Sequence, residues 1–143
     1  MERMMHGRAL VAGAAEGVAL VSREPLSFWG GYDQTTGEII DRRHPLSGAM
    51  AAGRILAVPS TRGSSTTTAV LLEAIRLGTA PAALLTAGAD AFLALASIVA
   101  DELYQKPVPV IALDPDDFAM LETGQTLRVF EDGRVEVEVS RVS

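Results

Sequence analysis

The stretch that decides the fold is residues 54–86, RILAVPSTRGSSTTTAVLLEAIRLGTAPAALLT. Its first part, 54–59, is a short apolar run of the kind that forms a buried strand. After a loop rich in hydroxyl side chains, apolar residues recur at helical spacing, and Gly78 supplies a C-terminal cap. The residues on the predicted buried helix face are Val70, Leu71, Ala74 and Ile75. A second buried strand over 82–86 completes a βαβ unit, which predicts parallel core strands.

The same alternation continues toward the C-terminus. A second helix is predicted to start after the N-cap Asp90, and a third buried strand is predicted over 109–113. The apolar positions of this second helix are Phe92, Leu95, Ala96, Val99 and Leu103. Residues 126–140 alternate apolar and polar side chains around a turn at 132–133, which predicts an antiparallel hairpin. The expected fold class is α/β, with parallel core strands, helices and peripheral antiparallel β-hairpins.

The N-terminal part has a different pattern. Two apolar runs, 7–13 and 17–23, are separated by turn residues and predict a hairpin or a pair of neighbouring strands. Residues 26–48, LSFWGGYDQTTGEIIDRRHPLSG, are rich in glycine and turn-forming residues. Loops of this length are uncommon unless they are functional or disordered, and the aromatic pair Phe28 and Trp29 argues against disorder. We therefore expect an ordered, functional loop.

Composition and charge exclude several classes of function. A chain of 143 residues is the size of one domain, so a single domain over 1–143 is expected. The chain has neither a long apolar run nor a signal-like start, which predicts a cytoplasmic protein without a membrane span. A net charge of −6 without a basic block argues against nucleic-acid binding. The absence of cysteine excludes disulfides and any cysteine-held zinc or iron–sulfur cluster built from this chain alone.

The loop RGSST at 62–66 is the first candidate for chemistry. Where a loop enters a helix, unpaired backbone N–H groups and the positive end of the helix dipole favour an anion, such as a carboxylate, a phosphate or a serine oxyanion. The alternative is that Ser64 or Ser65 only caps the helix. The loop lacks P-loop spacing and the chain lacks a G-x-S-x-G motif, so neither nucleotide hydrolysis nor a Ser-His-Asp hydrolase is supported.

The second candidate is Trp29, which precedes a pair of glycines at 30–31. Such a tryptophan is either a core residue beside a tight turn or a wall for a substrate or partner, because glycine lets another group approach the backbone closely. The same long loop contains Asp33, Asp41 and His44. Their spacing matches no metal motif, so we expect no metal site in this chain.

Three segments together resemble one known family, the small subunit of aconitase X. They are residues 26–48, then GRILAVPSTRGSS at 53–65 and TAPAALLTAGAD at 79–90. The motifs S-F-W-G-G-x-D-x-x-T-G, H-P-L-x-G and R-G-S-S are far more specific in combination than any one of them, and the similarity covers nearly the whole chain. The resemblance implies a swivelling β/β/α domain.

The resemblance also implies a function. Aconitase X enzymes are hydro-lyases in which a large subunit holds an iron–sulfur cluster and the small subunit closes over it. This chain would then be inactive without a large-subunit partner, whose cluster or iron acts on a small hydroxy-acid substrate. The first expectation is dehydration of cis-3-hydroxy-L-proline to Δ1-pyrroline-2-carboxylate, and the alternative is the small subunit of phosphomevalonate dehydratase of the mevalonate pathway. A non-catalytic swivel or interaction domain is the alternative from another class.

The resemblance assigns roles to individual residues. In ordinary aconitases the swivel domain carries a G-S-S-R segment whose first serine is the catalytic base, and Ser64 matches that serine. Thr66 stands where aconitase has a substrate-binding arginine, so a tricarboxylate substrate is not expected, and Arg62 is a candidate to supply the missing charge. The expected substrate-binding residues are Arg62, Gly63, Ser65, Thr66, Ser27, Trp29, Gly30 and Gly31.

Overall fold

The computed structural model describes residues 2–62 and 65–138. Its centre is a set of four parallel strands. They are β3 (Ala15–Val21), β5 (Ile55–Ala57), β7 (Ala83–Thr86) and β8 (Val110–Ala112). Antiparallel strands extend this sheet at both sides, in the order β1-β10-β9-β3-β5-β7-β8-β2. They are β1 (Glu2–His6), β2 (Arg8–Val11), β9 (Thr126–Val129) and β10 (Arg134–Glu138).

The remaining elements are three helices and a separate pair of very short strands. The helices are α1 (Ser65–Leu77), α2 (Ala91–Tyr104) and α3 (Pro115–Phe118). The short strands β4 (Leu26–Ser27) and β6 (Thr61–Arg62) form a parallel ladder of their own. Among the described residues, no helix has the length and apolar character needed to cross a membrane.

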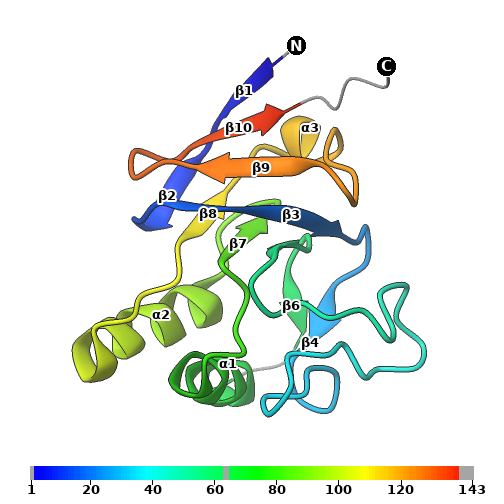
Figure 1. Ribbon diagram of the computed structural model, residues 1–143, viewed down its shortest axis with the longest axis vertical. Helices are drawn as coiled ribbons and strands as arrows, with labels where there is room; N and C mark the ends of the chain where they lie inside the picture. The colour runs from blue at the N-terminus through cyan, green and yellow to red at the C-terminus, as the bar shows by residue number, and fades with distance from the viewer. Residues whose placement is uncertain (1, 63–64, 139–143) are drawn as a thin grey trace.

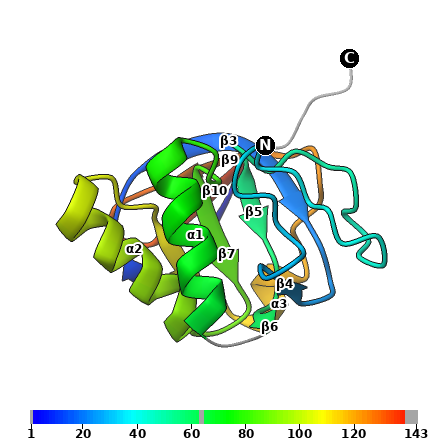
Figure 2. The same cartoon turned by 90° about the horizontal axis from the view of Figure 1, so that it is seen from below.

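The central strands carry apolar side chains on both faces, and this divides the fold into layers. In β5, Leu56 belongs to the core beneath the helices, while its neighbours Ile55 and Ala57 belong to a second core shared with β9 and β10. Figure 1 shows α1 and α2 on one side of the central strands and β9, β10 and β1 on the other, and Figure 2 shows the two helices covering their face. Parallel strands need both faces covered. The expected β/β/α arrangement is confirmed.

Several local predictions are confirmed by the structure. The first predicted helix is α1, with the four predicted apolar residues buried and Gly78 at a positive φ of 79° after its end. The C-terminal hairpin is β9 and β10, in which Val135 pairs with Val129 and both are buried. Its turn contains Gly133, where a Cβ would overlap the carbonyl oxygen of Gly7. Periodicity and turn residues were sufficient here because the interactions are local.

The predicted N-terminal hairpin is wrong. β2 pairs with β8 at one edge of the sheet, whereas β3 lies in the middle between β5 and β9. The burial of the two strands explains this difference. β3 contains Ala19 and Leu20, which are buried on opposite faces of the sheet, while every residue of β2 is at least partly exposed. The sequence pattern indicated two strands but did not specify their partners. It also did not reveal β1 or the short helix α3.

The predicted apolar face of the second helix is also largely wrong. Of the expected residues only Ala96 is buried, and Phe92, Leu95 and Leu103 are exposed. The buried residues of α2 are Leu93, Ala96, Ser97 and Ala100. Because three of these four side chains are small, α2 can pack closely against α1, β2 and β8. Close packing, rather than burial of the largest apolar side chains, decided which face is turned inward.

The long loop after β4 is part of the core, as expected for an ordered loop. Phe28 and Tyr32 are buried and stack with ring centroids 5.0 Å apart. The Tyr32 hydroxyl donates a hydrogen bond of 2.7 Å to the carbonyl oxygen of Thr79, just after α1. Burial raises the pKa of Tyr32 well above its ordinary value, so the hydroxyl keeps its proton and remains a donor. Ile39, also buried, forms a bridge with Tyr32 and closes the loop on itself.

Replacing Tyr32 with phenylalanine should lower the free energy of unfolding by about 1 kcal/mol, because the Thr79 carbonyl loses a buried partner. Tyr104→Phe is the matched control, since the described residues offer its hydroxyl no hydrogen bond, and its effect should stay within about 0.5 kcal/mol. Urea denaturation followed by circular dichroism measures both variants. Equal effects for the two variants would show that the Tyr32 hydroxyl does not hold the loop.

Candidate functional site

The pairing of β4 with β6 brings the two candidate segments together. Leu26 is paired with Thr61, and Ser27 is paired with Arg62. The strands are parallel, so the turn that follows Ser27 and the loop that follows Arg62 leave from the same end of the ladder. Two predicted segments that are 35 positions apart in the sequence therefore meet at one edge. Gly63 and Ser64, together with the side chain of Ser65, lie outside the described residues.

The turn that contains the SFWGG motif is closed by hydrogen bonds within the segment itself. The Ser27 hydroxyl donates to the Trp29 carbonyl oxygen at 3.1 Å, and the Tyr32 N–H donates to the Phe28 carbonyl oxygen at 3.2 Å. Gly30 has a positive φ of 72°, and a Cβ at Gly31 would overlap the Ser27 carbonyl oxygen. Gly31 therefore requires glycine, and Gly30 adopts a backbone conformation that favours it.

The two aromatic residues of this turn have opposite environments. Phe28 is fully buried, whereas 69% of the Trp29 surface is exposed. Trp29 is thus not the core residue of the turn, and the first alternative given for it is wrong. An exposed tryptophan on a turn fixed by glycines remains suited to contact with a substrate or partner.

A buried carboxylate ties β6 to a helix. Asp90, which is 7% exposed, caps α2 by accepting from the Leu93 N–H at 3.1 Å. Its second oxygen accepts from the Thr61 N–H at 2.9 Å and from the Thr61 hydroxyl at 2.7 Å. The cap predicted at Asp90 is confirmed. The sequence analysis did not predict the hydrogen bonds to Thr61, because local sequence patterns do not indicate a partner 29 positions away.

The row of hydroxyl residues at the start of α1 has a role beyond capping. The Thr67 hydroxyl, which is buried, donates to the Arg62 carbonyl oxygen at 3.4 Å. The Thr68 hydroxyl donates to the Phe92 carbonyl oxygen at 3.2 Å and so connects α1 to α2. Thr66 is exposed. Two of the threonines thus fix the first turn of the helix against β6 and α2.

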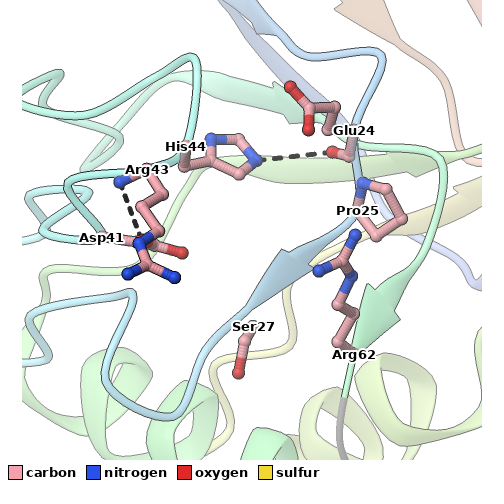
Figure 3. Close-up of a pocket in the computed structure, with 7 residues that line it drawn as sticks. All are labelled: Glu24, Pro25, Ser27, Asp41, Arg43, His44 and Arg62. Carbon is pink, nitrogen blue, oxygen red and sulfur yellow. Dashed lines mark hydrogen bonds between the residues drawn. The ribbon is translucent and has the colours of Figure 1, made fainter.

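A hollow of about 390 Å³ lies beside this ladder. Its lining consists of Glu24, Pro25, Ser27, Asp41, Arg43, His44 and Arg62. Figure 3 shows the Arg43 side chain on one side and the Arg62 side chain, from β6, on the other, with Ser27 between them. Of the predicted site residues whose side chains the structure describes, Ser27 and Arg62 line the hollow. Trp29, Gly30, Gly31 and Thr66 do not.

His44 holds one wall of this hollow in place. It is buried, and its Nδ1 accepts from the Leu46 N–H at 3.1 Å. Its proton is therefore on Nε2, which lies 3.4 Å from the Glu24 carbonyl oxygen and 3.5 Å from the Ser22 hydroxyl oxygen. The loop around His44 is thereby attached to the chain between β3 and β4. Sequence reasoning did not place His44 or Arg43 in the site, because their spacing indicates nothing about their distance from Arg62.

The described residues do not fit an iron–sulfur cluster or another metal centre. The chain has no cysteine, and iron–sulfur clusters are held by cysteine thiolates. Within 2–62 and 65–138, no group of three histidine, aspartate or glutamate side chains converges as metal ligands would. Both oxygens of Asp90 and both ring nitrogens of His44 already have protein partners.

Comparison with known proteins finds relatives over nearly the whole chain. A family model described as the aconitase X swivel domain matches residues 4–139. The cis-3-hydroxy-L-proline dehydratase of Pseudomonas aeruginosa is 48% identical over 130 residues, which are 91% of this chain and 22% of that enzyme. The phosphomevalonate dehydratase small subunit of Thermococcus onnurineus is 37% identical over 135 residues, which are 94% of this chain and 98% of that subunit.

A solved structure has the same fold. The crystal structure of Thermococcus kodakaraensis aconitase X in its holo-form matches with a TM-score of 0.86 and 34% identity, over 96% of this chain and 99% of that chain. The chain spans 22% and 19% of the length of two cis-3-hydroxy-L-proline dehydratases that it matches. The fold expected from the resemblance is therefore confirmed by an experimental structure, while most of each longer relative has no counterpart in this chain.

Replacing Asp90 with alanine should lower the free energy of unfolding by about 1.5–3 kcal/mol, because the Leu93 N–H and both Thr61 donors lose a charged partner. Asp101→Ala, at an exposed position of the same helix, is the control and should change stability by about 0.5 kcal/mol or less. Chemical denaturation measures both. Amide hydrogen exchange at Thr61 should also accelerate in the Asp90 variant, and unchanged exchange there would contradict the proposed connection.

Proposed function

This chain belongs to the aconitase X swivel-domain family, and on that basis we propose that it supplies the general base of a hydro-lyase whose other active-site groups lie in a large subunit. The proposal is supported by relatives named cis-3-hydroxy-L-proline dehydratase and phosphomevalonate dehydratase small subunit. In the first, the matching region is a minor part of one longer chain; in the second, it is nearly a whole subunit. Both arrangements fit a swivel domain that acts together with a larger body, and we assign that domain to residues 1–143 and to the cytoplasm.

The observation that carries the proposal is the pairing of Ser27 with Arg62 at the end of the β4–β6 ladder. Ser64 follows Arg62 by two positions and directly precedes Ser65, the first residue of α1. The residues expected to bind substrate are thus supplied by two neighbouring backbone segments rather than by one loop alone. We assign the general base to Ser64 and substrate contacts to Arg62, Gly63, Ser65 and Thr66. Trp29, Gly30 and Gly31 are assigned to the wall that meets the partner.

In the proposed reaction, Ser64 removes the proton from the carbon next to the substrate carboxylate. The electron pair of that C–H bond forms a carbon–carbon double bond as the β-hydroxyl leaves. The acceptor is the deprotonated Ser64 oxygen, which becomes the hydroxyl again, and the β-hydroxyl departs on the side of the partner as hydroxide, which takes up a proton to become water. With cis-3-hydroxy-L-proline the resulting enamine tautomerises to Δ1-pyrroline-2-carboxylate.

The helix N-terminus alone cannot lower the pKa of a serine hydroxyl enough for it to act as the base. A helix N-terminus stabilises an adjacent anion by about 0.3–2 kcal/mol, and each pKa unit corresponds to about 1.36 kcal/mol. An alcohol that must lose its proton near neutral pH needs a larger effect than the helix can provide. We assign the remainder to the Arg62 guanidinium and to the exclusion of water when the two chains close, since charges interact more strongly in a dry site.

The cofactor expected of the family belongs, in this proposal, to the large subunit. The residues of this chain do not fit an iron–sulfur cluster, so no step of the reaction is assigned to such a group here. The isolated chain should therefore have no dehydratase activity. The higher identity to the Pseudomonas enzyme, 48% against 37%, favours cis-3-hydroxy-L-proline over phosphomevalonate as the substrate.

The test of this proposal is an assay of the chain alone and together with its large subunit. We expect the pair to dehydrate cis-3-hydroxy-L-proline and the isolated chain to be inactive. Phosphomevalonate is assayed in parallel, and turnover of phosphomevalonate alone would reverse the order of the two substrates. If the pair assembles and converts neither compound, both substrate assignments are wrong and the non-catalytic interaction domain is favoured over them.

Within the active pair, Ser64→Ala should lower kcat about a hundredfold or more while assembly is unaffected, because it removes the proton acceptor. If Ser64 is only a helix cap, the same substitution should cost about 0.5–2 kcal/mol of stability and leave kcat unchanged. Ser47→Ala, at an exposed serine outside the hollow, controls for the loss of a hydroxyl. A well-assembled Ser64→Ala pair with normal turnover would refute the assignment of the base.

A further inference from the structure

The hollow beside β4 and β6 carries charged groups of both signs, and the proposed proton transfer uses only one of its residues, Arg62. Arg43 faces it from the loop across the hollow (Figure 3). Within the described part of the chain, the arginines that form ion pairs are Arg76, Arg128 and Arg134. Neither Arg43 nor Arg62 is among them. Two guanidinium groups that line one hollow without a carboxylate partner favour the entry of an anion.

The backbone that carries Arg43 is fixed before any ligand arrives. The Arg43 N–H donates to Oδ1 of Asp41 at 3.0 Å, and the His44 N–H donates to the Asp41 carbonyl oxygen at 3.1 Å. The His44 ring in turn attaches this turn to the carbonyl oxygen of Glu24. The backbone that carries the guanidinium is therefore preorganised, and this reduces the conformational entropy that is lost when a ligand binds.

The same hollow also offers oxygen acceptors. The Asp41 carboxylate lines it, and only its Oδ1 has a hydrogen-bond partner among the described residues. Ser27 donates its proton to the Trp29 carbonyl oxygen, so its hydroxyl oxygen presents lone pairs rather than a donor. These acceptors suit a positively charged N–H group. A volume of about 390 Å³ is enough for a small molecule.

From these contacts we infer that Arg43 is a specificity-determining residue: Arg43 and Arg62 bind the carboxylate of a small zwitterionic amino acid, and Asp41 with the Ser27 oxygen accepts from its ammonium group. This inference rests on the proposed function and adds residues that determine its substrate. Cis-3-hydroxy-L-proline carries a carboxylate and a ring ammonium group, so it matches both signs. Phosphomevalonate carries two anionic groups and no cation, so the Asp41 carboxylate disfavours it.

The test compares Arg43→Gln with Arg42→Gln in the reconstituted pair. Arg42 is the neighbouring residue, exposed and outside the lining, so its substitution removes the same charge without touching the hollow. Arg43→Gln should raise KM for cis-3-hydroxy-L-proline about tenfold or more, as expected for the loss of a charge-assisted hydrogen bond, with a smaller change in kcat. Arg43→Lys should restore part of the affinity. Arg42→Gln should behave as the wild type.

Two competitive inhibitors separate the contribution of the carboxylate contact from that of the ammonium contact. L-proline is zwitterionic, and cyclopentanecarboxylate has the same ring size with the carboxylate alone. Arg43→Gln should weaken both inhibitors, whereas Asp41→Asn should weaken only L-proline, because asparagine still accepts from the Arg43 N–H but has no charge. Equal loss of both inhibitors in Asp41→Asn would overturn the ammonium contact.

The outcomes also distinguish this inference from the proposed function. An active wild-type pair in which Arg43→Gln and Arg42→Gln have the same KM overturns the role of Arg43 and leaves the dehydratase proposal intact. A wild-type pair that converts no substrate overturns both. Thermal unfolding of each variant, compared with Arg43→Lys, identifies a loss of affinity that comes only from misfolding.

Discussion

The candidate site depends on one buried carboxylate. Asp90 accepts hydrogen bonds from the start of α2 and from both donors of Thr61, and so it attaches β6 to the helical layer. β6 has only two residues, too few to hold its position through a sheet of its own. Because β4 pairs with β6, the same attachment also supports the turn that carries Trp29, together with the buried side chains of Phe28 and Tyr32. A carboxylate buried between β6 and the start of α2 thus joins these two elements directly, and β4 through its pairing with β6.

The long loop extends this arrangement over the remaining wall of the hollow. Its aromatic residues Phe28 and Tyr32 join the core beneath the helices, and His44 attaches its far end to the chain that follows β3. A segment with almost no regular secondary structure is thus held in place by many backbone hydrogen bonds within the chain. This explains how the loop can present Arg43 and Asp41 at defined positions without being a helix or strand.

Under the proposed function, the chain supplies some of the groups that an elimination reaction needs and lacks others. It offers a hydroxyl at a helix start, two arginines without carboxylate partners among the described residues, and a preformed hollow. It lacks cysteine, and its described residues form no cluster of metal ligands. An enzyme that divides its active site between two bodies can exclude water when they close and release product when they open. The exposed Trp29, on the turn that follows β4, is consistent with such a contact surface.

The sequence by itself determined the features whose physical causes are local. Periodicity predicted α1, β5, β7 and β8, and short-range chemistry predicted the cap at Asp90 and the glycine after α1. Only the tertiary structure decided that β3 lies in the centre of the sheet and that α2 turns its small residues inward. It also decided that Arg43 and His44 face Arg62 across one hollow. These features depend on strand pairing and close packing between distant segments, and such contacts leave no periodic signal in a single sequence.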